Sequence, residues 1–244
     1  PVSSQWRGNI KMNVILQISR FDPEKDSKPY YKEYTIKTHP GMTILDGLNQ
    51  IKWEQDGTLT YRRSCRSGIC GSCAMKIHGI NGLACEAQIE TLKKSKIVID
   101  PLPGFKVLRD IAVDMDPFYE HLERVKPYLI NDTPPPDRER LQSKEDFKVF
   151  EDAVACILCG SCTSSCPSFW ADKSYIGPAA LYKAFRYNFD TRDQGRADRM
   201  EVLDNKHGLW RCHTIFNCMD ACPKNLKITD GISKLKRMVI KEKF

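Results

Sequence analysis

The eleven cysteines of this 244-residue chain fall into three tight groups, and their spacing indicates which chemistry they can do. The count is odd, and the chain is longer than the usual secreted disulfide scaffold. Such grouping is typical of metal sites in a reducing compartment. The groups contain Cys65, Cys70, Cys73 and Cys85; Cys156, Cys159, Cys162 and Cys166; and Cys212, Cys218 and Cys222.

The first group opens with C-x4-C-x2-C, and Cys85 follows after eleven further residues. This opening is the spacing of plant-type 2Fe–2S ferredoxins, so we expect all four thiols of the group to bind a 2Fe–2S cluster. Gly68 and Gly71 would let backbone N–H groups approach the sulfurs. Three arginines would offset the charge of the cluster, namely Arg62, Arg63 and Arg66. The alternative is a tetrahedral zinc site, although zinc sites more often show two C-x2-C pairs.

The second group has the C-x2-C-x2-C-x3-C-P spacing of bacterial ferredoxins, in which the fourth cysteine ligates the other cluster. The third group repeats this spacing but has Ile215 where the second has Cys159. Exchanging the fourth ligands gives one set of four thiols and one set of three. We expect a 4Fe–4S cluster on Cys156, Cys159, Cys162 and Cys222, and a different cluster on Cys166, Cys212 and Cys218.

Ile215 supplies no ligand atom, which favours a 3Fe–4S cluster in the three-thiol set. The alternative is a labile 4Fe–4S cluster whose open corner takes water or another side chain. Losing an iron and a thiolate is expected to raise the reduction potential, which suits a terminal electron acceptor. All eleven cysteines are then used, and no substrate-activating base or nucleophile is evident. The sequence thus predicts an electron carrier with no catalytic residue.

The elements that would position the first group form a small α+β domain. Strands are predicted over residues 12–18 and 30–37, where apolar or β-branched residues recur. A helix is predicted to start at Thr43, with Asp46 completing a capping box. Residues 59–73 are predicted to be a loop, and 73–85 a hairpin that turns at Asn81-Gly82. A last short strand is expected over residues 96–100.

Helical periodicity dominates the rest of the chain. Helices are predicted over residues 117–127, 143–156, 178–192 and 229–242, separated by "NDTPPPDR" and by the cysteine groups. We place the domain boundary near residue 112, which gives domains 1–112 and 113–244. The last helix carries an apolar stripe that is expected to pack on the second domain: Ile232, Leu235, Met238 and Val239.

Composition excludes some classes of protein. The chain is 41% hydrophobic and 28% charged, as is usual for globular proteins, and carries a net charge of +7. No apolar run approaches the roughly 18 residues that cross a bilayer, and no signal peptide is expected at the start. The basic residues are dispersed without a nucleic-acid motif, so we expect no nucleic-acid partner. The charge would suit anionic clusters, an acidic partner or an anionic membrane face.

Seven segments give the chain a specific resemblance, over nearly its whole length, to the iron–sulfur subunits of succinate dehydrogenases and fumarate reductases (complex II). These segments are "RRSCRSGICGSCAM", "NGLAC", "PLPGFKVLRDIAVDM", "CILCGSCTSSCPSFW", "IGPAAL", "RCHTIFNC" and "CPKNL". The resemblance implies an α+β fold class, with an N-terminal β-grasp 2Fe–2S ferredoxin-like domain followed by an all-α helical ferredoxin domain.

The resemblance also implies a role in the respiratory chain and the tricarboxylic acid cycle. Electrons would pass from FAD in a flavoprotein subunit through 2Fe–2S, 4Fe–4S and 3Fe–4S clusters to quinone, beside a membrane anchor that often carries haem b. The dicarboxylate would bind the flavoprotein, not this chain. The expected location is peripheral, on the cytoplasmic face of a bacterial inner membrane or the matrix face in mitochondria. The alternatives are a quinol:fumarate reductase, a stand-alone polyferredoxin and a zinc-stabilised interaction module.

The resemblance places a quinone pocket at Pro167, Ser168, Trp170, His213 and Ile215. Trp170 would give apolar area and a donor N–H, and His213 could relay protons. Many relatives have a second tryptophan directly after the first, where this chain has Ala171. This departure leaves the choice between ubiquinone and menaquinone open.

Overall fold

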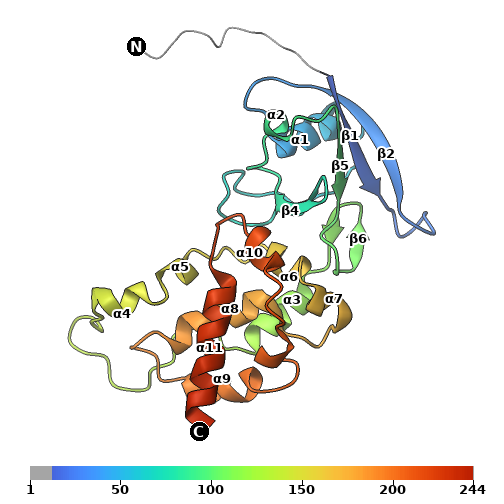
Figure 1. Ribbon diagram of the computed structural model, residues 1–244. Helices are drawn as coiled ribbons and strands as arrows, with labels where there is room; N and C mark the ends of the chain where they lie inside the picture. Colours follow the sequence, from blue (N-terminus) through green and yellow to red (C-terminus); the bar gives the residue numbers. More distant parts are fainter. Residues whose placement is uncertain (1–12, 244) are drawn as a thin grey trace, which may run out of the picture. The chain divides into compact units, whose positions relative to one another are not determined.

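The computed structural model describes residues 13–243, which fold into two compact units (Figure 1). The first unit runs to residue 102 and includes residues 106–113. The second unit comprises residues 103–105 and the rest of the chain from residue 114. Met12, which belongs to the first predicted strand, lies outside the described residues.

The first unit is built on a five-stranded sheet in the order β2-β1-β5-β3-β4. Its strands are β1 (Asn13–Arg20), β2 (Tyr30–Lys37), β3 (Ala74–Ile77), β4 (Ile80–Leu83) and β5 (Lys96–Asp100). The central strands β1 and β5 are parallel, and the other pairs are antiparallel. Val14, Leu16 and Ile18 on β1 are buried, as their alternation predicts. The predicted strands at 30–37 and 96–100 are confirmed.

The helix α1 (Ile44–Glu54) begins as predicted. The Thr43 hydroxyl accepts from the Asp46 N–H, and the Asp46 carboxylate accepts from the Thr43 N–H, so the capping box is complete. The apolar face of the helix is fully buried at Ile44, Leu48 and Ile51. The chain after α1 enters the loop 59–73, which contains no helix or strand. The helix therefore fixes one end of the first cysteine loop.

The predicted hairpin forms, but its turn is at His78-Gly79 and the prediction of Asn81-Gly82 is wrong. His78 and Gly79 both have positive φ, at 46° and 93°, as the commonest two-residue hairpin turn requires. Asn81 lies in β4 opposite Lys76. This register puts three apolar side chains in the core, which outweighs the local turn preference of Asn-Gly: Met75, Ile77 and Leu83.

The second unit is helical. Its elements are α3 (Asp116–Glu123), α4 (Lys144–Lys148), α5 (Glu151–Val154), α6 (Ser161–Ser164), α7 (Pro167–Ala171), α8 (Gly177–Asn188), α9 (Arg196–Leu203), the 3₁₀ helix η1 (Leu209–Arg211), α10 (Asn217–Asp220) and α11 (Ile228–Lys243). The helices α8 and α11 lie side by side (Figure 1). The predicted stripe on α11 is buried at Ile232, Leu235, Met238 and Val239.

Several helix bounds differ from the predictions. The helix predicted over 143–156 is divided into α4 and α5, because the buried Phe150 has a non-helical backbone, with φ −128° and ψ 8°. The helices predicted from 117 and 178 end earlier, at Glu123 and Asn188. The elements α2 (Ile89–Leu92), β6 (Val107–Arg109), β7 (Ala112–Val113), α6, α7, α9, η1 and α10 were not predicted, since all but α9 are too short to show periodicity. No helix in residues 13–243 combines the length and apolar character that a membrane span needs.

Candidate metal centres

Backbone N–H groups of the loop 65–73 converge on the thiols of the first cysteine group. Gly68 donates to the Sγ atom of Cys85 at 3.3 Å. Three further N–H groups donate to the Sγ atom of Cys65 at 3.4, 3.3 and 3.2 Å, those of Ser67, Ile69 and Cys70. Donors aimed at a sulfur stabilise the thiolate, which is the form that binds metal. The loop is therefore shaped around anionic sulfur.

The same loop brings the other two thiols of the group into place. The Cys70 Sγ atom accepts from the Cys65 N–H at 3.5 Å, and the buried Cys73 lies close to Cys85. Donation from backbone N–H groups, first that of Ser67, lowers the pKa of Cys65 to about 6. Burial raises the pKa of Cys73 to about 12. All four predicted 2Fe–2S ligands thus lie along one loop and the strand end that faces it.

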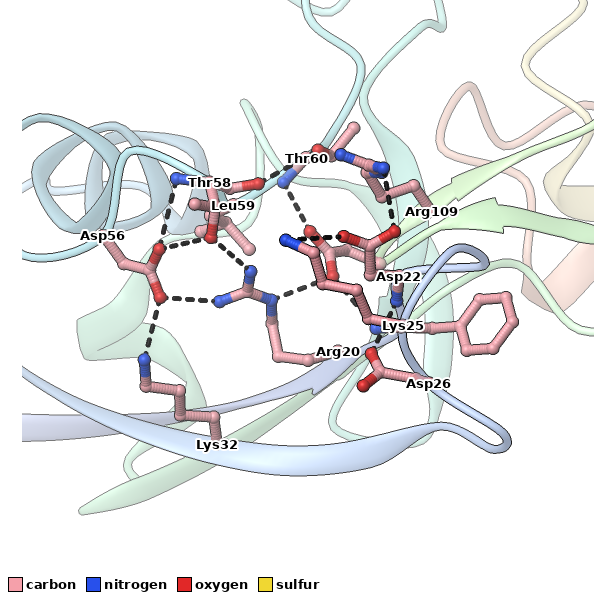
Figure 2. A network of polar contacts seen from close by, with 12 residues as sticks. Arg20, Asp22, Lys25, Asp26, Lys32, Asp56, Thr58, Leu59, Thr60 and Arg109 are labelled. Atoms are coloured by element: carbon pink, nitrogen blue, oxygen red, sulfur yellow. Dashed lines mark hydrogen bonds and ion pairs between the residues drawn. The ribbon is translucent and has the colours of Figure 1, made fainter.

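A buried ion network holds the chain segment that leads into this loop (Figure 2). The Arg20 guanidinium contacts Asp110 at 2.9 Å, Asp56 at 2.8 Å and the Thr58 hydroxyl at 2.8 Å, and it also contacts the Tyr34 hydroxyl. Burial alone would lower the pKa of Arg20, but its hydrogen bonds to Asp110 and Asp56 outweigh burial and raise it. The guanidinium therefore stays charged and fully paired, as a buried ion must.

The network extends toward the first cysteine along the backbone. Asp110 accepts from the Thr60 N–H at 2.7 Å, which fixes the segment before the loop. The Asn49 side chain on α1 then accepts from the Tyr61 hydroxyl and from Arg63, both at 2.8 Å. Arg63, predicted to offset cluster charge, is therefore engaged with Asn49. The sequence carries no local signal for this network, because its members are scattered from residue 20 to residue 110.

The second unit contains a cavity that we call the four-cysteine cavity. Four thiols from both cysteine runs line it: Cys156, Cys159, Cys162 and Cys222. Burial raises the pKa of the Cys156, Cys159 and Cys162 thiols. These are the four thiols that the exchanged-ligand spacing assigns to one cluster, and the structure brings them together.

A second cavity of similar size is lined by the other three thiols, and we call it the three-cysteine cavity. Its thiols are those of Cys166, Cys212 and Cys218. Ile215 lines the same cavity, with 46% of its surface exposed. Burial raises the pKa of Cys166 and Cys218. The two cavities are thus similar in size, and they differ by one thiol.

The backbone around the two cavities repeats itself. Leu158 and Thr214 both have positive φ, at 55° and 57°, and so do Gly160 and Phe216, at 82° and 71°. The short helices α6 and α10 follow at equivalent positions, after Gly160 and after Phe216. Ile215 therefore stands at the backbone position that Cys159 has in the other run.

The residues assigned to a quinone pocket are only partly brought together. Four of them line the three-cysteine cavity: Pro167, Ser168, His213 and Ile215. Trp170 does not line it, and its indole N–H is already donated to the Ser164 carbonyl at 2.7 Å. The Trp170 ring is 48% exposed, so it offers apolar area rather than a free donor.

The thiol arrangement bears on the zinc alternative. Within residues 13–243, no three or more Cys, His, Asp or Glu side chains gather closely enough to hold a single metal ion. A zinc ion draws its thiolates to about 2.3 Å from one centre. Each of the two cavities is lined by thiols from both cysteine runs, as the exchanged ligands of two iron–sulfur clusters require. The donor set, four or three thiolates with N–H donors, also suits such groups.

Comparison with known families agrees with this geometry. A family model described as "2Fe-2S iron-sulfur cluster binding domain" matches residues 15–120. A second, described as "4Fe-4S dicluster domain", matches residues 148–223. The two matches cover the loop of the first cysteine group and both ferredoxin-type runs. They agree with an N-terminal 2Fe–2S domain built on a sheet and a mostly helical C-terminal domain.

Individual relatives cover almost the whole chain. The succinate dehydrogenase iron–sulfur subunit of Paracoccus denitrificans is 43% identical over 225 residues, which is 91% of this chain and 86% of the relative. That of Coxiella burnetii is 41% identical over 233 residues, 94% of this chain and 98% of the relative. A chain of the Mycobacterium smegmatis Sdh1 complex in the apo form has a TM-score of 0.84 at 26% identity, covering 96% of this chain and 98% of its own. The chain belongs to the family of succinate dehydrogenase iron–sulfur subunits.

Proposed function

We propose that this chain is the electron-transfer subunit of a membrane-bound succinate:quinone oxidoreductase. The observation that carries the proposal is the pair of similar cavities, one lined by four thiols and one by three, in a chain of this family. When bound, a 2Fe–2S, a 4Fe–4S and a 3Fe–4S cluster supply the redox couples that link FAD of a flavoprotein subunit to quinone. The chain itself contributes ligands and their surroundings, and no catalytic residue.

The positions of the thiols support the ligand sets that we propose. In the proposed domain 1–112, the four thiols of the first group hold the 2Fe–2S cluster. In the proposed domain 113–244, the four-cysteine cavity takes the 4Fe–4S cluster and the three-cysteine cavity the 3Fe–4S cluster. Ile215 supports the last assignment, because it keeps the backbone of a ligand loop but carries a hydrocarbon. Among residues 13–243, the cysteines that line this cavity are Cys166, Cys212 and Cys218.

The quinone site is proposed at the rim of the three-cysteine cavity, shared with an anchor subunit. Pro167, Ser168 and Ile215 line the cavity, and the exposed His213 lies beside them. His213 is suited to hold or move a proton as quinone is reduced, because an imidazole ring can both donate and accept a proton. Trp170 would contribute its exposed ring.

Membership of the family supports the partners and the location that we propose. The proposed partners are an FAD-containing flavoprotein, which binds the dicarboxylate, and an anchor subunit with quinone and possible haem b sites. The chain would lie peripherally on the cytoplasmic face of a bacterial inner membrane, or on the matrix face in mitochondria. The exposed apolar side chains of Ile215 and Phe216, next to the three-cysteine cavity, support an anchor at that face.

The proposal is tested on the complex purified from membranes. Succinate should reduce the clusters, followed by EPR during a titration with succinate and then dithionite. The flavoprotein and the anchor should co-purify with the chain. A chain that elutes alone would favour a free polyferredoxin, and zinc without acid-labile sulfide would favour an interaction module. Comparing succinate–quinone with quinol–fumarate rates would separate the two directions, which use the same residues of this chain.

A further inference from the structure

Side-chain hydroxyls accompany all three thiols of the three-cysteine cavity. The Thr229 Oγ1 atom lies 3.5 Å from the Cys218 Sγ atom. The Tyr175 side chain lies near Cys212 and the Ser168 side chain near Cys166, on the lining of the same cavity. All three hydroxyl-bearing residues line the cavity and are buried, with exposed fractions of 5% or less.

The hydroxyls come from three separate parts of the second unit. Ser168 lies on α7, Tyr175 in the segment between α7 and α8, and Thr229 in the first turn of α11. No single turn of backbone would place all three at the same cavity. The pairing of one hydroxyl with each thiol is therefore a property of the tertiary fold.

The four-cysteine cavity is lined differently. Its lining contains no serine, threonine or tyrosine, and most of its members other than the cysteines are apolar. Behind the lining, the Ser161 side chain is buried close to Cys159. Cys156 has the Leu158 backbone N–H and the charge of Lys183 nearby instead. The cavities therefore differ in hydroxyl donors as well as in thiol number.

A thiolate that binds iron has lost its proton and can only accept. Each neighbouring hydroxyl must then donate to the sulfur. A donated hydrogen bond stabilises the more negative, reduced cluster more than the oxidised one, so it raises the reduction potential. The buried position strengthens this effect, because little water competes for the sulfur.

We propose that Tyr175 and Thr229, together with Ser168, are positioning residues that raise the reduction potential of the cluster in the three-cysteine cavity. They would do so independently of the missing fourth thiol. This inference rests on the proposed function and deepens it, because it names side chains that make this cavity the terminal electron acceptor. Ser168 also belongs to the proposed quinone site, so the tests use the other two residues.

The test is an EPR-monitored redox titration of the purified complex with Tyr175→Phe and with Thr229→Val. Both changes remove a hydroxyl and nearly keep the side-chain volume. At a fixed ambient potential, each should lower the reduced-to-oxidised ratio of this cluster by about tenfold, about 59 mV for a one-electron couple. Thr229→Ser, which keeps the hydroxyl, should keep most of the wild-type reduction potential.

Tyr182→Phe is the matched control. Tyr182 is equally buried, on α8, but it does not line the three-cysteine cavity. Its replacement should leave the potential of this cluster unchanged. An unchanged potential in both Tyr175→Phe and Thr229→Val, or an equal shift in Tyr182→Phe, would overturn the inference. If the complex with Tyr175→Phe does not assemble, the difference in reduction potential between Thr229→Val and Thr229→Ser tests the inference.

The same titration separates this inference from the proposed function. A wild-type complex without an oxidised-state EPR signal from a trinuclear cluster would contradict the proposed function. A wild-type complex that shows the signal, with variants whose potential does not move, would contradict only the role of the hydroxyls.

Discussion

The four-cysteine and three-cysteine cavities share a backbone and differ in their side chains. Leu158 and Gly160 in one run, and Thr214 and Phe216 in the other, adopt the same left-handed conformations, and a short helix follows each. Between them stands a thiol in one case and Ile215 in the other. The repeat thus preserves the shape of a ligand loop even where the ligand is lost. Side chains, and not the path of the backbone, therefore distinguish the two cavities.

Of the changes that distinguish the two cavities, Cys218→Ser should have the largest effect. The three-cysteine cavity has no spare thiol, so losing one leaves two, and we expect the whole cluster to be lost. Iron content should fall from about nine to about six per chain, and quinone reduction by succinate should stop. Iron analysis and EPR check this. Retention of about nine irons would show that Cys218 is not a ligand.

His213→Gln should have the next largest effect, on quinone reduction alone. If the imidazole moves a proton at the quinone, its loss should slow quinone reduction by about 100-fold, at the low end for general acid–base catalysis. Electron transfer from succinate to an artificial dye should be spared. Trp170→Phe is the comparison variant, and it should act more weakly because the indole N–H already binds Ser164. An equal loss of rate in the quinone and dye assays would show that His213 does not act at the quinone site.

The reciprocal exchanges Ile215→Cys and Cys159→Ile test whether the residue at this position sets the number of irons in each cavity. Because the backbone is the same, Ile215→Cys should add about one iron and convert the trinuclear cluster to a 4Fe–4S form of lower potential. Cys159→Ile should remove about one iron from the other cavity. Iron analysis with EPR of the oxidised protein measures both. An unchanged oxidised-state signal in Ile215→Cys would count against the ligand assignment.

The smallest predicted effect concerns the left-handed residues of the repeat. Gly160 adopts φ 82° without strain, whereas Phe216 adopts φ 71° at the equivalent position. Gly160→Ala should lower the free energy of unfolding by about 1 kcal/mol, the usual strain of a side chain in this region. Phe216→Gly should relieve a similar strain, since the Phe216 ring is 50% exposed and loses little packing. Thermal unfolding of the two variants measures the difference, and opposite signs are expected.

Cysteine spacing alone predicts which thiols share a cavity, and the structure places them so; what they bind stays a prediction. The capping box at Thr43 and the strands at 30–37 and 96–100 could be predicted because their signals are local. The hairpin turn could not, because burial of Met75 and Leu83 overrode the preference of Asn81-Gly82. Local signals therefore predict elements well where tertiary packing does not compete with them.

The side chains that surround the thiols could not be predicted from the sequence. Tyr175 and Thr229 come from separate elements and meet the cavity only after folding. Arg20 and Asp110 are 90 residues apart and form one ion pair. The spacing of the cysteines carries no information about such partners. The ligands are encoded in short motifs, whereas the groups that tune and hold them are encoded in the fold.

The iron content and oxidised-state EPR spectrum of the purified complex test most directly whether the two cavities hold different clusters. We predict about nine irons per chain. We also predict an EPR signal from an oxidised trinuclear cluster, and this signal should disappear when succinate reduces the cluster. About ten irons and no such signal would show that the three-cysteine cavity holds a second 4Fe–4S cluster, and would contradict the account.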